Sequence, residues 1–293
     1  MARRQVPQRR LMLFGLSAAL GWGFADFLGA LAGRRIGALS AVISGQLMSA
    51  IFMTAVLIAT GTSLEPLRGD IDLVILNGAA AAFAYVTHYK ALELGPVAVV
   101  SPIGAGYAIV GVALSILIAG DRPSVMALIG AGIAVIGVAL VSTDIRKLRD
   151  RIAQHVPGLW WAVAAAIGFG VAGFLLGWIS QRAGWIAGLW ASRVSQVAFY
   201  VPLALAFRHE LAELRPGTGL WIALLAGSAD ILGVVSFSLG STRGLISIVL
   251  AASAVFPLIA VTLSVIVFKE RIVANQLVGI ALTVGGLLLL GLG

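Results

Sequence analysis

The sequence predicts an all-α integral membrane protein with ten transmembrane helices, arranged as two inverted repeats of five helices each. Three observations predict this fold: the composition, the alternation of long apolar runs with short polar breaks, and a similarity between the two halves. Hydrophobic residues make up 60% of the 293 residues and charged residues 11%, with a mean hydropathy of +1.05. Soluble domains are about half apolar and about a quarter charged. Because so few charges cannot form a water-facing surface, we expect lipid to cover most of the exterior.

Apolar runs long enough to cross a bilayer follow one another along the whole chain. A spanning helix needs about 20 residues, so a chain of this length has room for roughly ten helices joined by short loops. Nine polar breaks separate the runs, which gives ten predicted helices with antiparallel neighbours. They cover residues 11–32, 38–60, 72–91, 96–119, 124–143, 158–180, 186–207, 219–240, 245–268 and 273–292.

The first apolar run follows a basic segment and is predicted to be a retained helix. Residues 1–10 contain four arginines, as the start of a signal peptide also does. The run over 11–32 is longer than the apolar region of a signal peptide, and it contains Asp26. We therefore expect a transmembrane helix here, with a cleaved signal peptide as the alternative.

The two halves of the chain are similar to each other. The longest charged break lies at the midpoint, which is where a duplication would place its linker. A shift of 149 residues pairs Asp121-Arg122 with Glu270-Arg271, and pairs two glycines of the fifth run with two of the tenth. A shift of 147 residues places Gly23 over Gly170. The predicted organisation is therefore a first repeat over 1–143, a charged linker over 144–157 and a second repeat over 158–293.

An odd number of helices in each repeat makes the second copy enter the membrane from the opposite side. Inverted repeats of this kind are common in secondary transporters, where the substrate site lies near the bilayer midplane between the halves. The repeat therefore predicts a transporter with a central cavity.

Three ionisable residues lie well inside predicted helices, namely Asp26, Arg193 and Asp230. Charge is costly in hydrocarbon, so such residues are functional candidates. They are expected to line a hydrated cavity and to pair with each other or with substrate; the alternative is a buried ion pair that only holds helices together. At the corresponding places of the other repeat stand Gly173, Gln46 and Ala81, so the charges are not repeated, which favours a role in function.

Proline and glycine interrupt the fourth and ninth helices at matching depth, around Pro102 and Pro257. Interrupted helices in both halves of a transporter indicate a substrate site, because the freed backbone carbonyls can line a cavity. The 149-residue shift also pairs Tyr107 with Phe256 beside the two interruptions. The alternative is that both prolines only shape the packing.

Aromatic side chains within the helices suit an amphipathic or ring-bearing substrate, since they offer a stacking surface and a polar edge. Ordinary core or lipid-facing packing is the alternative for each of them. The residues predicted for substrate binding or coupling are Asp26, Arg193, Asp230, Trp22, Gln46, Tyr85, Tyr89, Tyr107, Trp190 and Phe256.

The residues needed for several other functions are missing from the sequence. There is no cysteine, no phosphate-binding loop and no serine–histidine constellation. The three histidines, His88, His155 and His209, lack the spacing of metal ligands. We expect no cofactor, no metal and no enzymatic activity. Arginines that stand at helix ends rather than in one basic stripe also argue against nucleic-acid binding.

The motif Trp22-Gly23-Phe-Ala-Asp26-Phe and the turn Phe268-Lys-Glu-Arg271 before a glycine-rich last helix resemble the EamA family of the drug/metabolite transporter superfamily. The resemblance covers essentially the whole chain. It implies a multi-pass transporter of metabolites such as amino acids in the bacterial inner membrane. It also implies cytoplasmic termini, a central cavity and peripheral fifth and tenth helices. The family shares no universal substrate motif, so the site residues rest on the argument above.

The sequence therefore predicts a secondary transporter that exports a small amino-acid-like or amphipathic metabolite by alternating access. The expected partners are the small-molecule substrate, the lipid bilayer and protons as coupling ion, and the protein is a monomer or a homodimer. A passive channel, a lipid flippase or scramblase, and a membrane-embedded enzyme are the alternatives. Counting lysine and arginine does not support cytoplasmic termini, because that orientation places eight of them inside and eleven outside, Arg193 excluded.

Overall fold

A computed structural model describes residues 6–94, 100, 103–142, 158–206, 208, 211, 216–268 and 273–293. In that part of the chain the regular structure is entirely helical. The helices are α1 (Gln8–Ile36), α2 (Ala38–Thr60), the short 3-10 helix η1 (Glu65–Leu67), α3 (Ile71–Leu94), α5 (Tyr107–Leu117), α6 (Val125–Ser142), α8 (Leu159–Ala183), α9 (Trp185–Ala206), α11 (Thr218–Ser241), α12 (Ile246–Ser253), α13 (Phe256–Phe268) and α14 (Ala274–Leu292).

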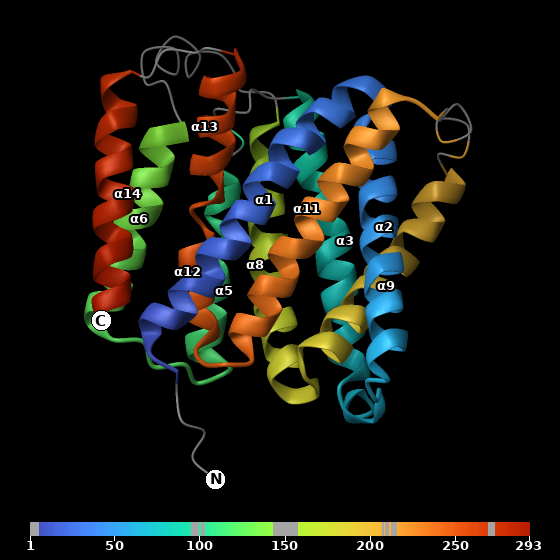
Figure 1. The fold of residues 1–293 in the computed structure, drawn as a ribbon, viewed down its shortest axis with the longest axis horizontal. Coiled ribbons are helices and arrows are strands. Elements are labelled where there is room, and N and C mark those ends of the chain that lie inside the picture. The colour runs from blue at the N-terminus through green and yellow to red at the C-terminus, as the bar shows by residue number, and fades with distance from the viewer. Residues whose placement is uncertain are drawn as a thin grey trace.

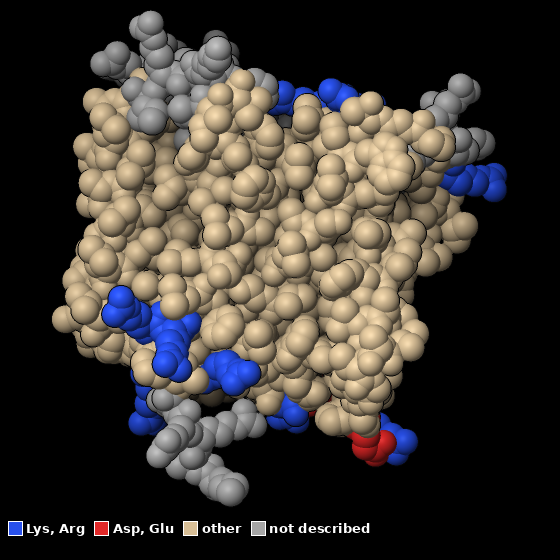
Figure 2. All heavy atoms as spheres, in the orientation of Figure 1, with Lys and Arg blue, Asp and Glu red and all other residues tan. Residues whose placement is uncertain are grey.

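These helices form ten passes through the molecule, because α12 and α13 together make one interrupted pass (Figure 1). Six helices are long and apolar enough to cross a bilayer, and several shorter ones are apolar too. Figure 2 shows a broad band free of charged side chains across the middle of one face, with basic side chains near its upper and lower edges. The fold class is confirmed as an all-α, multi-pass membrane protein.

The two repeats run in opposite directions. The first helix, α1, starts on the side where both termini lie, and α8, its counterpart, starts on the other side (Figure 1). We call the side on which α1 begins and α14 ends the termini side, and the opposite one the far side. The inverted arrangement that the sequence predicts is therefore present.

Helix packing repeats the same symmetry at individual glycines. A Cβ atom added to Gly23 in α1 would overlap Ile259 in α13, and one added to Gly170 in α8 would overlap Val110 in α5. Gly170 is 147 residues after Gly23, and Ile259 is 149 residues after Val110. Both contacts bring a backbone against a neighbouring helix, as small residues allow in membranes. The two repeats therefore contact each other at two places that the repeat symmetry makes equivalent.

Glycines of α6 pack directly against glycines at the equivalent positions of α14. Gly130 lies against the backbone of Gly286, and Gly137 lies against the backbone of Gly279. A two-fold axis that exchanges the repeats turns the first of these contacts into the second. The two helices form a pair at one edge of the molecule, away from its centre (Figure 1).

The first helix of each repeat ends at a glycine with an unusual backbone conformation. Gly37 has φ 81° and ψ 149°, and Gly184 has φ 85° and ψ 155°. This region is essentially restricted to glycine. The helix α1 ends at Ile36, beyond the predicted end at residue 32. Its last turn contains Arg34 and Arg35, and basic side chains interact favourably with the exposed carbonyl groups at a helix C-terminus.

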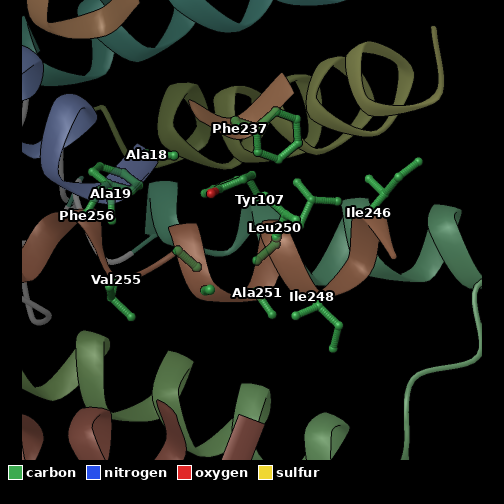
Figure 3. Packing of buried hydrophobic residues seen from close by; sticks show 14 of the residues in the cluster. Ala18, Ala19, Tyr107, Phe237, Ile246, Ile248, Leu250, Ala251, Val255 and Phe256 are labelled. Atoms are coloured by element: carbon green, nitrogen blue, oxygen red, sulfur yellow. The ribbon is translucent and has the colours of Figure 1, made fainter. Parts of the chain in front are cut away.

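The centre of the molecule contains two helix bundles. One bundle consists of α3, α5 and α8, and we call it the α8 bundle; the other consists of α1, α11, α12 and α13, and we call it the α1 bundle. They meet in an apolar core around α12, where Figure 3 shows the side chains of Tyr107, Phe237 and Leu250 together. The remaining central helices, α2 and α9, pack on each other and on both bundles.

Candidate functional site

A cavity of about 120 Å³ lies between the two repeats. Its lining comes from α1, α2, α3, α5, α8, α9, α11 and α13, so both bundles contribute. The cavity brings together most of the residues predicted for substrate binding or coupling. They are Trp22, Asp26, Gln46, Tyr85, Tyr89, Tyr107, Arg193, Asp230 and Phe256.

Arg193 is the centre of a polar network on one wall of this cavity. Its guanidinium donates to Asp230 Oδ2 at 3.0 Å, to Gln46 Oε1 at 2.6 Å and to Gln196 Oε1 at 2.8 Å. Gln196 in turn donates to the hydroxyl of Tyr200 at 2.9 Å. Arg193 is 4% exposed. The charge is therefore held by hydrogen bonds inside the membrane-spanning part of the protein.

Asp230 receives three side chains from three different helices. Tyr85 of α3 donates its hydroxyl to Oδ1 at 2.6 Å, and Gln46 of α2 lies 3.4 Å from Oδ2. Together with Arg193 of α9, these contacts offset the desolvation of a carboxylate that is also 4% exposed. The sequence argument left open whether Asp230 pairs with Arg193 or faces substrate; the structure shows the pair, at the wall of the cavity.

Gln46 and Arg193 stand at corresponding places of the two repeats, and in the structure they touch each other. Next to Gln46, α2 also packs closely on α11 at a pair of glycines. A Cβ atom on Gly227 of α11 would overlap the backbone of Gly45 in α2. The hydrogen bond between Gln46 and Arg193 joins equivalent positions, so it lies near the axis that relates the repeats; because one residue is glutamine and the other arginine, this contact is asymmetric.

The other carboxylate of the cavity, Asp26 of α1, lies beside His88 of α3. The Nε2 atom of His88 is 3.5 Å from Asp26 Oδ1, and this contact is an ion pair only when the imidazole is protonated. His88 is buried, and its ring packs edge-on against Phe169 and near Tyr89. The Asp26 side chain is 22% exposed. Asp26 is therefore the more accessible of the two carboxylates.

Aromatic rings form much of the remaining surface. Trp22 lies edge-on to Tyr107, with ring centroids 6.2 Å apart, and 5.7 Å from Phe237. Tyr107 also lies 6.2 Å from Phe256 and shares a hydrogen bond of 2.7 Å with Ser253. Such rings offer both apolar faces and polar edges to a ligand.

Several buried polar atoms at the cavity have no hydrogen-bond partner among the described residues. They include donors on Trp22 and Arg193, the hydroxyl of Ser192 and the second ring nitrogen of His88. An unpaired buried polar group typically costs about 1–3 kcal/mol, so such groups are rare without a reason. At this cavity they leave hydrogen-bonding capacity for water or a polar ligand.

Three of the predicted residues are not part of this lining. Trp190 donates its indole N–H to Thr54 Oγ1 at 3.1 Å and packs between α2 and α9. Pro257 lies in the first turn of α13, and the helix interruption comes before it, at Ala254 and Val255. Pro102 lies outside the described residues, although the turn at Gly106 does separate α5 from the helical residues 103–105.

The cavity also contains residues that the sequence argument did not select. His88, Ser192 and Gln196 belong to the lining, and Tyr200 belongs to the Arg193 network. Helical spacing could have identified them, because residues three or four apart share a face. His88 follows Tyr85 by three residues, and Gln196 follows Arg193 by three.

The charges of the lining do not balance. Arg193 and Asp230 neutralise each other, whereas the ion-pair partner that lies beside Asp26 among the described residues is a histidine, His88. With a neutral imidazole and an ionised Asp26, the described lining has one net negative charge, which favours a cationic group. Among the described residues, no three His, Cys, Asp or Glu side chains come together as a metal site would require.

An inverted repeat with a polar cavity between its halves is typical of polytopic membrane transporters. A family profile described as the EamA-like transporter family matches residues 9–143 and again 156–292. The chain therefore belongs to the EamA-like transporter family, as the resemblance in its sequence indicated. Each match covers one repeat.

The fold is also similar to that of solved proteins. One of them, described as "Crystal structure of protein", aligns with a TM-score of 0.77 over 97% of this chain and 97% of its own length. Its sequence is 18% identical, so the similarity establishes the fold alone. No curated protein sequence matches this chain.

Proposed function

We propose that this protein is a secondary transporter that exports a small amino-acid-like or amphipathic metabolite across the bacterial inner membrane by alternating access. The observation that supports this proposal is the cavity between the repeats, where unpartnered polar atoms and aromatic rings lie beside a buried ion pair. A metabolite with one charged group and an apolar side chain would satisfy both kinds of surface. The direction of transport and the inner-membrane location rest on the family resemblance.

Protons drive the exchange in this proposal, and Asp26 is the group that takes them up. Asp230 is held by Arg193, Tyr85 and Gln46, so its carboxylate is less free to change partners in each cycle. Asp26 is more exposed, and its Oδ1 lies 3.5 Å from His88 Nε2. A carboxylate that alternates between proton and substrate couples their movements, because both compete for the same negative charge.

Reconstituted vesicles test this proposal. Purified protein in liposomes is assayed with amino acids and amphipathic amines, first for exchange of labelled against unlabelled substrate and then for accumulation driven by a pH gradient. We expect both activities in the wild-type protein. A passive channel would show leakage without accumulation, and a lipid scramblase would move labelled phospholipid in vesicles without any added solute.

The variant Asp26→Asn separates coupling from transport. The amide has the same size and still forms hydrogen bonds, but it does not take up a proton. We expect exchange to continue at higher concentrations of a cationic substrate, because the charge that binds it is lost, while accumulation driven by the pH gradient falls at least tenfold. Gradient-driven accumulation at the wild-type level would remove Asp26 from the coupling mechanism. Glu65→Gln, at an exposed acid on the termini side, is the matched control.

A further inference from the structure

The buried carboxylate Asp121 lies outside the cavity and has no part in the transport mechanism proposed above. It belongs to the loop between α5 and α6 on the termini side, and it is 8% exposed. Its Oδ2 atom accepts a hydrogen bond of 2.8 Å from the backbone N–H of Ser247, at the start of α12. The loop is attached to α5 of the α8 bundle, whereas α12 is part of the α1 bundle. The contact therefore joins the two bundles.

A second contact joins the same bundles on the same side. Gln181, in the last turn of α8, donates its side-chain amide to the carbonyl of Ser241 at 3.0 Å and to that of Gly244 at 2.7 Å. The preceding residue of α8, Ser180, lies with its hydroxyl 2.6 Å from that of Ser238, and both side chains are fully buried. These contacts connect the end of α8 to the end of α11.

The contacts of Asp121 and Gln181 satisfy backbone groups at or just beyond helix ends. The first N–H groups of α12 and the last carbonyls of α11 have no acceptor or donor inside their own helices. A carboxylate is favoured at a helix N-terminus, and an amide N–H pairs with free C-terminal carbonyls. Burial raises the pKa of the Asp121 carboxyl above its usual value, while the bond from Ser247 lowers it.

We propose that Asp121 and Gln181 form a latch that holds the two bundles together on the termini side and opens when the cavity opens to that side. The inference rests on alternating access as proposed above. Water replaces all of these hydrogen bonds once the bundles separate, because both helix ends lie at the edge of the membrane. The latch therefore shifts the balance between two states without fixing either one.

A thiol reporter tests the latch in this cysteine-free chain. Ser247→Cys changes only an oxygen to a sulfur in a side chain that is 2% exposed, and the backbone N–H that binds Asp121 stays. The rate of its modification by a membrane-impermeant reagent is measured in vesicles with the termini side outward. Protease removal of an N-terminal tag identifies that side. We expect slow modification, which reports rare opening.

In this background Asp121→Ala should raise the modification rate about tenfold, which corresponds to 1.4 kcal/mol for a hydrogen bond to a charged group. Asp121→Asn keeps an oxygen acceptor and should raise the rate clearly less. Gln181→Ala should raise it as well, and it also serves if Asp121→Ala fails to fold. Glu65→Gln, an exposed acid on the same side, should leave it unchanged.

Unchanged rates in Asp121→Ala and Gln181→Ala would overturn the latch, and so would an equal rise with Glu65→Gln. A second reporter separates opening from loosening. Ser192→Cys lies in the cavity wall, and its modification from the far side should slow when the latch is removed. Faster modification from both sides would mean a general loss of packing and would also overturn the proposal. Neither assay needs a substrate, so failure here leaves the transport proposal to its own experiment.

Discussion

Arg193 and Asp230 illustrate how one pair of residues can serve both stability and binding. A charge in the middle of a bilayer costs roughly 3 kcal/mol or more on insertion scales. The pair offsets this cost, because Gln46, Gln196 and Tyr85 satisfy much of its remaining hydrogen-bonding capacity. The Nε atom of Arg193 nevertheless has no partner among the described residues. The pair is therefore held on most sides, with the Nε–H donor of Arg193 left over.

Replacing one partner of this pair should destabilise the protein more than replacing both. In Asp230→Asn the guanidinium of Arg193 stays buried without its counter-charge, at a cost of roughly 3–5 kcal/mol. The double variant Asp230→Asn with Arg193→Gln removes both charges and should recover most of that loss. Thermal unfolding of the purified proteins in detergent measures the difference. A single variant as stable as the double one would contradict the buried pair.

His88 should affect the pH dependence of transport rather than the stability of the fold. The Nε2 atom of His88 lies 3.5 Å from Asp26 Oδ1, and a positive charge on the imidazole would compete with a cationic substrate for that carboxylate. His88→Gln keeps a hydrogen-bonding side chain of similar length but does not titrate. We expect the pH profile of exchange to become flatter, with an unfolding temperature close to the wild-type value. A profile that keeps its shape would place the pH sensitivity elsewhere.

At the scale of the helices, glycine positions decide which pairs pack closely. Small residues let two backbones approach, and in membranes such contacts replace the hydrophobic driving force that is absent in lipid. The α6–α14 pair depends on four of them, and neighbouring glycines in the same helices face open space. Each of these two helices therefore has one face where a larger residue would clash and another face where it would fit.

Two adjacent glycines of α14 provide a matched comparison of these faces. A Cβ atom at Gly286 would overlap the backbone of Gly130 and Ala134, whereas one at Gly285 meets nothing within 4 Å. Gly286→Ala should destabilise the protein by about 1–3 kcal/mol through overpacking. Gly285→Ala should be neutral or slightly stabilising, because alanine favours a helix by about 1 kcal/mol over glycine. Equal unfolding temperatures of the two variants would show that α6 and α14 do not pack in this way.

At the scale of the whole molecule, the architecture is largely readable from the sequence, because its signals are local. Apolar runs mark the passes, and repeated glycines such as Gly130 and Gly279 mark equivalent contacts. The details depend on neighbours. The interruption of the ninth pass comes before Pro257, since proline is tolerated in the first turn of a helix.

The site is less predictable than the fold for a physical reason. Helical spacing shows which residues share a face, but it does not show which helix that face meets. Intramembrane charge was enough to select Arg193 and Asp230, because few environments accept them. An aromatic residue such as Trp190 has many acceptable environments, and a histidine near a predicted helix end, such as His88, gave no signal by itself.

Orientation is the last property of the whole molecule to be tested, and we predict that the termini lie in the cytoplasm. Counting basic residues opposes this orientation, whereas the four arginines within residues 1–10 favour it, since charges beside the first helix usually dominate. Ser63 lies exposed on the termini side, and Thr218 lies exposed at the start of α11 on the far side. Thr218→Cys should therefore react with an impermeant thiol reagent in intact cells, and Ser63→Cys only after the membrane is permeabilised. The reverse pattern would place the termini outside and keep the fold, and reaction of both in intact cells would contradict the inverted repeat itself.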